Sequence, residues 1–131
     1  MLIVRRFVSA LSAAAGLVVA GACASSGVES DDLCDALTGL SLIDLFIESA
    51  EWTASDGTTP PHCKVTGVIE TEINFELLLP DSSSWNGRFL MGGGGGYVGT
   101  VQNQAMGLFD EGGTPLQRGY ATVGTDTGHE G

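Results

Sequence analysis

The chain has 131 residues, of which 16 are acidic and five are basic, and its formal net charge at neutral pH is −11. This length is enough for one modest domain. Because an acidic surface repels phosphate backbones, the composition argues against nucleic acid as a partner.

The N-terminus has the pattern of a secretory signal peptide. Arg5 and Arg6 form a short basic region, residues 7–20 carry no charge, and small residues suited to cleavage extend to Ala22. The uncharged run is short for a membrane span. We therefore expect residues 1–22 to be removed and the protein to be secreted or periplasmic. The alternative is an anchor helix that stays attached.

Cys23 directly follows the small residues, so residues 20–23 also resemble a bacterial lipoprotein box. A large aliphatic residue is usual three places before the lipidated cysteine, and here that residue is Ala20. Ordinary cleavage is favoured, and contact with a membrane is expected only if Cys23 is lipidated. The small, polar residues 23–30 indicate a linker.

Cys34 and Cys63 remain as one pair in an oxidising compartment. We predict a disulfide between them, which would close a loop of about 30 residues and stabilise the fold by roughly 3–4 kcal/mol. Two buried free thiols are the alternative.

In chain order, the first predicted element is a short helix that Asp31 and Asp32 cap and Gly39 ends. The apolar residues of 40–52 fit either a second helix or a strand over 44–52, and aromatic and β-branched residues favour the strand. A loop over 53–61 follows, with a proline pair and an Asp-Gly step.

Three strands are expected next, over residues 62–69, 72–79 and 88–91. The second has the clearest pattern, since apolar and polar residues alternate along it. A turn over 80–87 separates it from the third.

The pattern changes after residue 91. We expect a loop over 92–99, a helix within 101–109, a helical turn near 115–118 and a strand over 120–125. A strand, a crossover and a second strand form a βαβ-like unit, which places the two strands parallel. The chain is therefore predicted to have an α/β fold whose antiparallel edge strands lead into a parallel unit.

Five consecutive glycines, Gly92 to Gly96, follow the strand predicted over 88–91. Backbone N–H groups in such a loop can bind a phosphate or the oxyanion of an ester under attack, and a plain surface turn is the third interpretation. Residues 94–99 satisfy G-x-G-x-x-G, but five glycines match almost any glycine pattern. Residue 114, where a dinucleotide fold needs an acid, is threonine.

The sequence blocks on either side of the glycine run favour the interpretation that its loop binds an oxyanion. They are W-N-G-R-F-L at 85–90, G-G-Y-V-G at 95–99, R-G-Y-A at 118–121 and T-D-T-G-H at 125–129, with C-D-A-L at 34–37, C-K-V-T-G at 63–67 and I-N-F-E at 73–76 upstream. In this order they resemble the tannase and feruloyl esterase family. The resemblance covers about residues 33 to 131.

The resemblance implies an α/β-hydrolase fold with a lid domain inserted later in the chain. Residues 31–131 would be the N-terminal part of the catalytic domain. Family members hydrolyse small carboxylic esters of phenolic or aromatic acids, such as galloyl and feruloyl esters, with Ser, Asp and His. The family's calcium lies in the lid, so no cofactor is expected in this chain. The early disulfide of the family matches Cys34 and Cys63.

By the same resemblance, Gly95 would be an oxyanion donor and Gly96 its neighbour. Many members carry asparagine where this chain has Gly94. The nucleophile, the acid and the histidine follow in that order in α/β-hydrolases, and no G-x-S-x-G occurs here. We therefore expect the chain to lack esterase activity by itself. A noncatalytic secreted or lipid-anchored module that binds aromatic glycosides is the alternative function.

Two histidines are candidates for chemistry. His129 lies close to Asp126 in sequence, but it precedes the nucleophile, so we interpret residues 126–129 as a structural turn at the end of a strand. His62 is expected in a loop. Neither histidine has metal ligands at a useful spacing.

Overall fold

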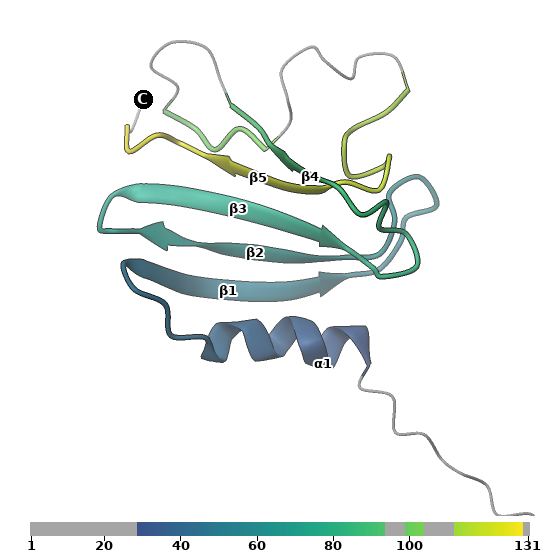
Figure 1. Cartoon of the computed structure of the whole chain (residues 1–131), viewed down its shortest axis with the longest axis horizontal. Helices are drawn as coiled ribbons and strands as arrows, with labels where there is room; N and C mark the ends of the chain where they lie inside the picture. Colours follow the sequence, from purple (N-terminus) through teal and green to yellow (C-terminus); the bar gives the residue numbers. More distant parts are fainter. Residues whose placement is uncertain (1–28, 94–98, 104–111, 130–131) are drawn as a thin grey trace, which may run out of the picture.

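The computed structural model describes residues 29–93, 99–103 and 112–129 (Figure 1). The predicted signal peptide, the lipidation site at Cys23 and most of the linker lie outside these residues. The elements are the helix α1 (Ser30–Asp35), the 3₁₀ helix η1 (Ala36–Gly39) and the strands β1 (Leu45–Thr53), β2 (His62–Ile69), β3 (Ile73–Pro80), β4 (Phe89–Met91) and β5 (Ala121–Thr125).

The strands form one five-stranded sheet in the order β1-β2-β3-β5-β4. The first three strands are an antiparallel meander. β5 then lies between β3 and β4, antiparallel to β3 and parallel to β4. The sheet is therefore mixed, as the sequence predicted. Of the helix expected within 101–109, residues 101–103 have no regular structure, and the remainder lies outside the described residues.

Residues 45–53 form the strand that the sequence favoured over a second helix. Three residues of β1, namely Leu45, Ile47 and Trp52, pack against the core. The pairing with β2 shifts between Ile47 and Ser49, which is the mark of a bulge.

The helix α1 begins at Ser30, which is earlier than a cap at Asp31 or Asp32 would place it, and its cap differs from the prediction. Glu29 occupies the N-cap position and makes no side-chain capping bond. Asp31 and Asp32 lie in the first turn, where negative charge is favourable next to the positive end of a helix dipole. The helical segment ends at Gly39, as expected.

A disulfide joins Cys34 of α1 to Cys63 of β2, with the two Cα atoms 5.6 Å apart, and confirms the predicted pairing. Both cysteines are buried in the core with Ala50, Val65 and Phe75. Figure 1 shows α1 alongside β1, and the covalent bond fixes it to the next strand. The core therefore lies between α1 and one face of the meander.

The opposite face of the meander is more polar. Ser49 and Thr66 form a hydrogen bond of 2.9 Å across β1 and β2. Lys64 and Glu76 form an ion pair of 2.8 Å across β2 and β3. Within the described residues, no helix is long and apolar enough to cross a membrane.

Candidate functional site

The candidate site lies at the carboxyl ends of the two parallel strands (Figure 1). Met91 of β4 pairs with Val123 of β5, so the segments that follow the two strands leave the sheet at the same end. The glycine run follows β4, and residues 126–129 follow β5. Ligands of open α/β sheets bind at this end, and the topology therefore brings the two predicted segments to one place.

The glycine run begins as an extension of the sheet. The Gly92 N–H donates to the Val123 carbonyl at 2.7 Å, so the ladder with β5 continues one residue past β4. Among the residues that the structure describes, no atom would lie within 4 Å of a Cβ atom on Gly93. Gly95 and Gly96 lie outside the described residues, so their role as oxyanion donors stays a prediction.

The chain returns to β5 at Gln102. Its N–H donates to the Thr125 carbonyl at 3.5 Å. A Cβ atom on Gly124 would overlap the Gln102 carbonyl and come within 2.6 Å of the Asn103 nitrogen. Only glycine therefore lets the returning backbone lie this close to β5.

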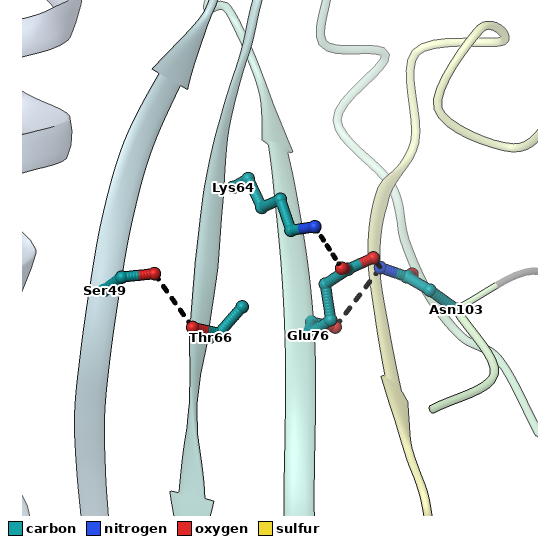
Figure 2. A network of polar contacts seen from close by, with 5 residues as sticks. All are labelled: Ser49, Lys64, Thr66, Glu76 and Asn103. Atoms are coloured by element: carbon teal, nitrogen blue, oxygen red, sulfur yellow. Dashed lines mark hydrogen bonds and ion pairs between the residues drawn. The ribbon is translucent and has the colours of Figure 1, made fainter. Parts of the chain in front are cut away.

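Asn103 connects this returning segment to the polar face of the sheet (Figure 2). Its Nδ2 donates to the carboxylate Oε1 of Glu76 at 3.0 Å and to the Glu76 carbonyl at 3.3 Å. Partial burial would raise the pKa of Glu76. The bonds from Lys64 and Asn103 and the positive charge of Lys64 outweigh it, so the pKa of this carboxyl lies below its usual value.

Asp126 fixes the turn that follows β5. Its carboxylate accepts bonds from the Asn74 backbone N–H at 3.0 Å, the Asn74 Nδ2 at 2.6 Å and the Gly128 N–H at 3.0 Å. The Asp126 N–H in turn donates to the Asn74 carbonyl at 3.1 Å. The Asn74 amide, followed by the Gly128 N–H, lowers the pKa of Asp126 against the opposing effect of burial.

His129 is exposed at the end of this turn. Its backbone N–H donates to the Asp126 carbonyl at 3.3 Å, and its Nδ1 lies 3.2 Å from the Thr127 carbonyl. The Asp126 carboxylate is committed to Asn74 and Gly128. This is the arrangement of a structural turn, which is the role that the sequence suggested.

The strand predicted over residues 62–69 begins at His62, so the separate expectation that His62 lies in a loop was wrong. It is the first residue of β2 and is only 9% exposed, with its Nδ1 3.0 Å from the Pro60 carbonyl. His62 lines a cavity of about 200 Å³ together with Asn103 and Thr122. The loop ends at the proline pair, and His62, which follows it directly, pairs with Pro80 of β3.

Sequence reasoning missed the residues that hold the two segments, namely Asn74, Glu76, Asn103 and Gly124. A signal existed for Gly124 only, because an isolated glycine within a strand indicates close approach of another backbone. Among the described ranges, no group of three or more His, Cys, Asp or Glu side chains converges as a metal site would require.

The sequence model of the tannase and feruloyl esterase family matches residues 59–131, which is more than half of the chain. The chain belongs to this family. The match includes the glycine run, Asn103, Gly124 and the turn at Asp126.

Curated relatives agree with this assignment. The chain is 38% identical over 101 residues to mono(2-hydroxyethyl) terephthalate hydrolase from Piscinibacter sakaiensis, a match that covers 64% of this chain and 16% of that protein. It is 37% identical over 110 residues to an uncharacterized esterase from Xanthomonas campestris, covering 73% of this chain and 18% of that one. The chain thus spans less than one fifth of the length of these relatives.

Two solved structures have the same fold over this region. An esterase from Aspergillus oryzae superposes with a TM-score of 0.59 at 21% identity, covering 77% of this chain and 23% of that one. Feruloyl esterase B from the same organism gives 0.56 at 23% identity, with 77% and 22% coverage. Together with the mixed sheet, these neighbours fit an α/β-hydrolase-like fold.

Proposed function

We propose that this chain is the N-terminal part of the catalytic domain of a secreted or periplasmic carboxylic ester hydrolase. The enzyme would cleave esters of aromatic acids with a serine nucleophile. The observation that carries the proposal is the family match over residues 59–131, within which the glycine run and the Asp126 turn follow adjacent parallel strands.

The glycine run would supply half of the oxyanion hole. When the nucleophile attacks an ester carbonyl, negative charge develops on the carbonyl oxygen, and backbone N–H groups aimed at that oxygen stabilise the transition state. The Gly95 N–H is the proposed donor, with Gly96 beside it. Loss of one such donor costs about 3–4 kcal/mol. In the α/β-hydrolase order, the serine, the acid and the histidine would come from sequence beyond this region.

The substrate class is inferred from the relatives. The family is described as tannase and feruloyl esterase, and the relative from Piscinibacter sakaiensis is named for an ester of terephthalic acid, which is also an aromatic acid. The acidic composition supports a small-molecule substrate over nucleic acid. The Cys34–Cys63 disulfide supports an oxidising compartment.

The test is an assay of the gene product that includes any sequence encoded beyond Gly131. It should hydrolyse at least one of methyl gallate, methyl ferulate and mono(2-hydroxyethyl) terephthalate, and a serine-directed phosphonate should abolish turnover. The 131-residue chain is the matched control and should show no turnover. A longer product that cleaves none of the three esters would contradict the proposal, as would equal activity of the short chain.

A further inference from the structure

We propose that Asn103 is a positioning residue for the glycine run, and that Glu76 is the acceptor through which it acts. This inference rests on the proposed esterase function. It concerns how the chain holds the loop that carries the oxyanion donors, and neither residue is proposed to touch the substrate.

The two ends of the glycine-containing segment are bound to the same strand. Gly92 donates to the Val123 carbonyl, and Gln102 donates to the Thr125 carbonyl. These two carbonyls are two residues apart, so they point to the same side of β5. The segment therefore leaves and rejoins β5 at neighbouring positions of one hydrogen-bond ladder, on either side of Gly124.

The returning end needs a further anchor, because the Gln102 bond is long at 3.5 Å. Asn103 supplies it with the two bonds from Nδ2 to Glu76 (Figure 2). Asn103 is 9% exposed as a whole residue, so these bonds are largely shielded from water. Glu76 pairs with Gly124 across β3 and β5, which places the acceptor beside the point of return.

Glu76 itself is fixed in place. The Lys64 ammonium lies 2.8 Å from Oε2, while Asn103 binds Oε1. The carboxylate is thus bound on both oxygens, by β2 on one side and by the returning segment on the other. A hydrogen bond to a charged acceptor is stronger than one between neutral groups. Because Glu76 is fixed on the sheet, this bond holds Asn103 at a fixed position relative to the sheet.

Loosening this anchor should affect the transition state more than the bound substrate. An oxyanion hole works because its N–H groups are aimed before charge develops, and misplacement of a catalytic group by about 1 Å can cost about 100-fold in rate. Substrate binding depends on other contacts. The expected signature is therefore a lower kcat with little change in KM.

The experiment uses the full-length enzyme and compares Asn103→Leu, Glu76→Ala and Glu76→Gln. Asn103→Leu and Glu76→Ala remove the bond between the carboxylate and the amide, and each should lower kcat by about 10-fold to 100-fold while KM stays within about twofold. Affinity for an arylboronic acid, which binds the serine as a tetrahedral adduct, should fall by a similar factor. Affinity for the free aromatic acid should not change.

Glu76→Gln is the discriminating variant, because its amide oxygen still accepts from Asn103 although the charge is lost. It should retain kcat within about threefold of the parent. Ser49→Ala is the matched control, since it breaks a polar pair on the same face of the sheet, on β1 (Figure 2). It should leave kcat unchanged.

The outcomes separate this inference from the proposed function. A parent enzyme that cleaves no aromatic ester overturns the proposed function and this inference with it. An active parent whose Asn103→Leu and Glu76→Ala variants keep normal kcat overturns only the inference. If Asn103→Leu does not fold, the comparison of the two Glu76 variants tests the inference. Equal kcat for Glu76→Gln and Glu76→Ala would contradict the positioning role.

Discussion

At the scale of single residues, Asp126 does the most to shape the candidate site. It is 5% exposed, and its carboxylate accepts three hydrogen bonds that join the start of β3 to the turn after β5. The sequence predicted Asp126 in a structural turn at the end of a strand. It could not reveal the partner, since Asn74 is 52 residues away along the chain.

Asp126 should make the stability of the fold depend on pH. Its pKa is lowered in the folded state from the ordinary value of 3.8. The unfolded chain therefore takes up the proton first as pH falls. The stabilisation is complete above that ordinary value and is lost as pH drops below it toward the lowered folded pKa.

Thermal unfolding between about pH 6 and pH 3 checks this dependence. Asp126→Asn should lower the melting temperature at pH 6 and flatten its fall in acid. Glu48→Gln, at an exposed position of β1, serves as the control and should follow the parent curve. Parallel acid profiles for Asp126→Asn and the parent would contradict the assignment.

Gly124 carries a second prediction at the residue scale. A methyl group there would overlap the Gln102 carbonyl. Gly124→Ala should therefore destabilise the fold by about 2 kcal/mol or more and increase amide hydrogen exchange in the peptide around residue 102. Gly39→Ala is the matched control, because a Cβ atom there would meet no atom of the described part of the chain within 4 Å. Unchanged exchange in Gly124→Ala would show that the two backbones do not touch.

At the scale of elements, local pattern was sufficient for the strands. The alternation over 72–79 and the apolar residues of 120–125 are local patterns that predict strands, and strands form over 73–80 and 121–125. The insertion of β5 between β3 and β4 depends on contacts between distant segments. The hydrogen bonds of Asn103 also join distant segments, so no local motif predicted them.

The disulfide is the strongest link between α1 and the sheet. The helix has only six residues and could not persist alone. Replacing both Cys34 and Cys63 with alanine should cost roughly 3–4 kcal/mol of unfolding free energy. Denaturant unfolding of the parent with and without reductant gives the same comparison. A midpoint that does not change in either experiment would contradict a structural role for this bond.

At the scale of the whole molecule, β4 lies at the edge of the sheet and exposes two large apolar side chains. Phe89 is 59% exposed and Met91 is 65% exposed. Exposed apolar edge strands promote association. The 131-residue chain should therefore self-associate in light-scattering measurements, and Phe89→Lys with Met91→Lys should reduce this. A monodisperse parent chain would contradict the expectation.

In the proposed function, the glycine run stabilises the transition state of ester hydrolysis. The most direct measurement is kcat for an aromatic ester with the full-length product, comparing the parent with Gly95→Val, whose side chain should obstruct the approach of the substrate oxygen to the backbone. Circular dichroism establishes that both proteins are folded. We expect kcat to fall by about 10²- to 10³-fold. A folded Gly95→Val enzyme with the kcat of the parent would contradict it.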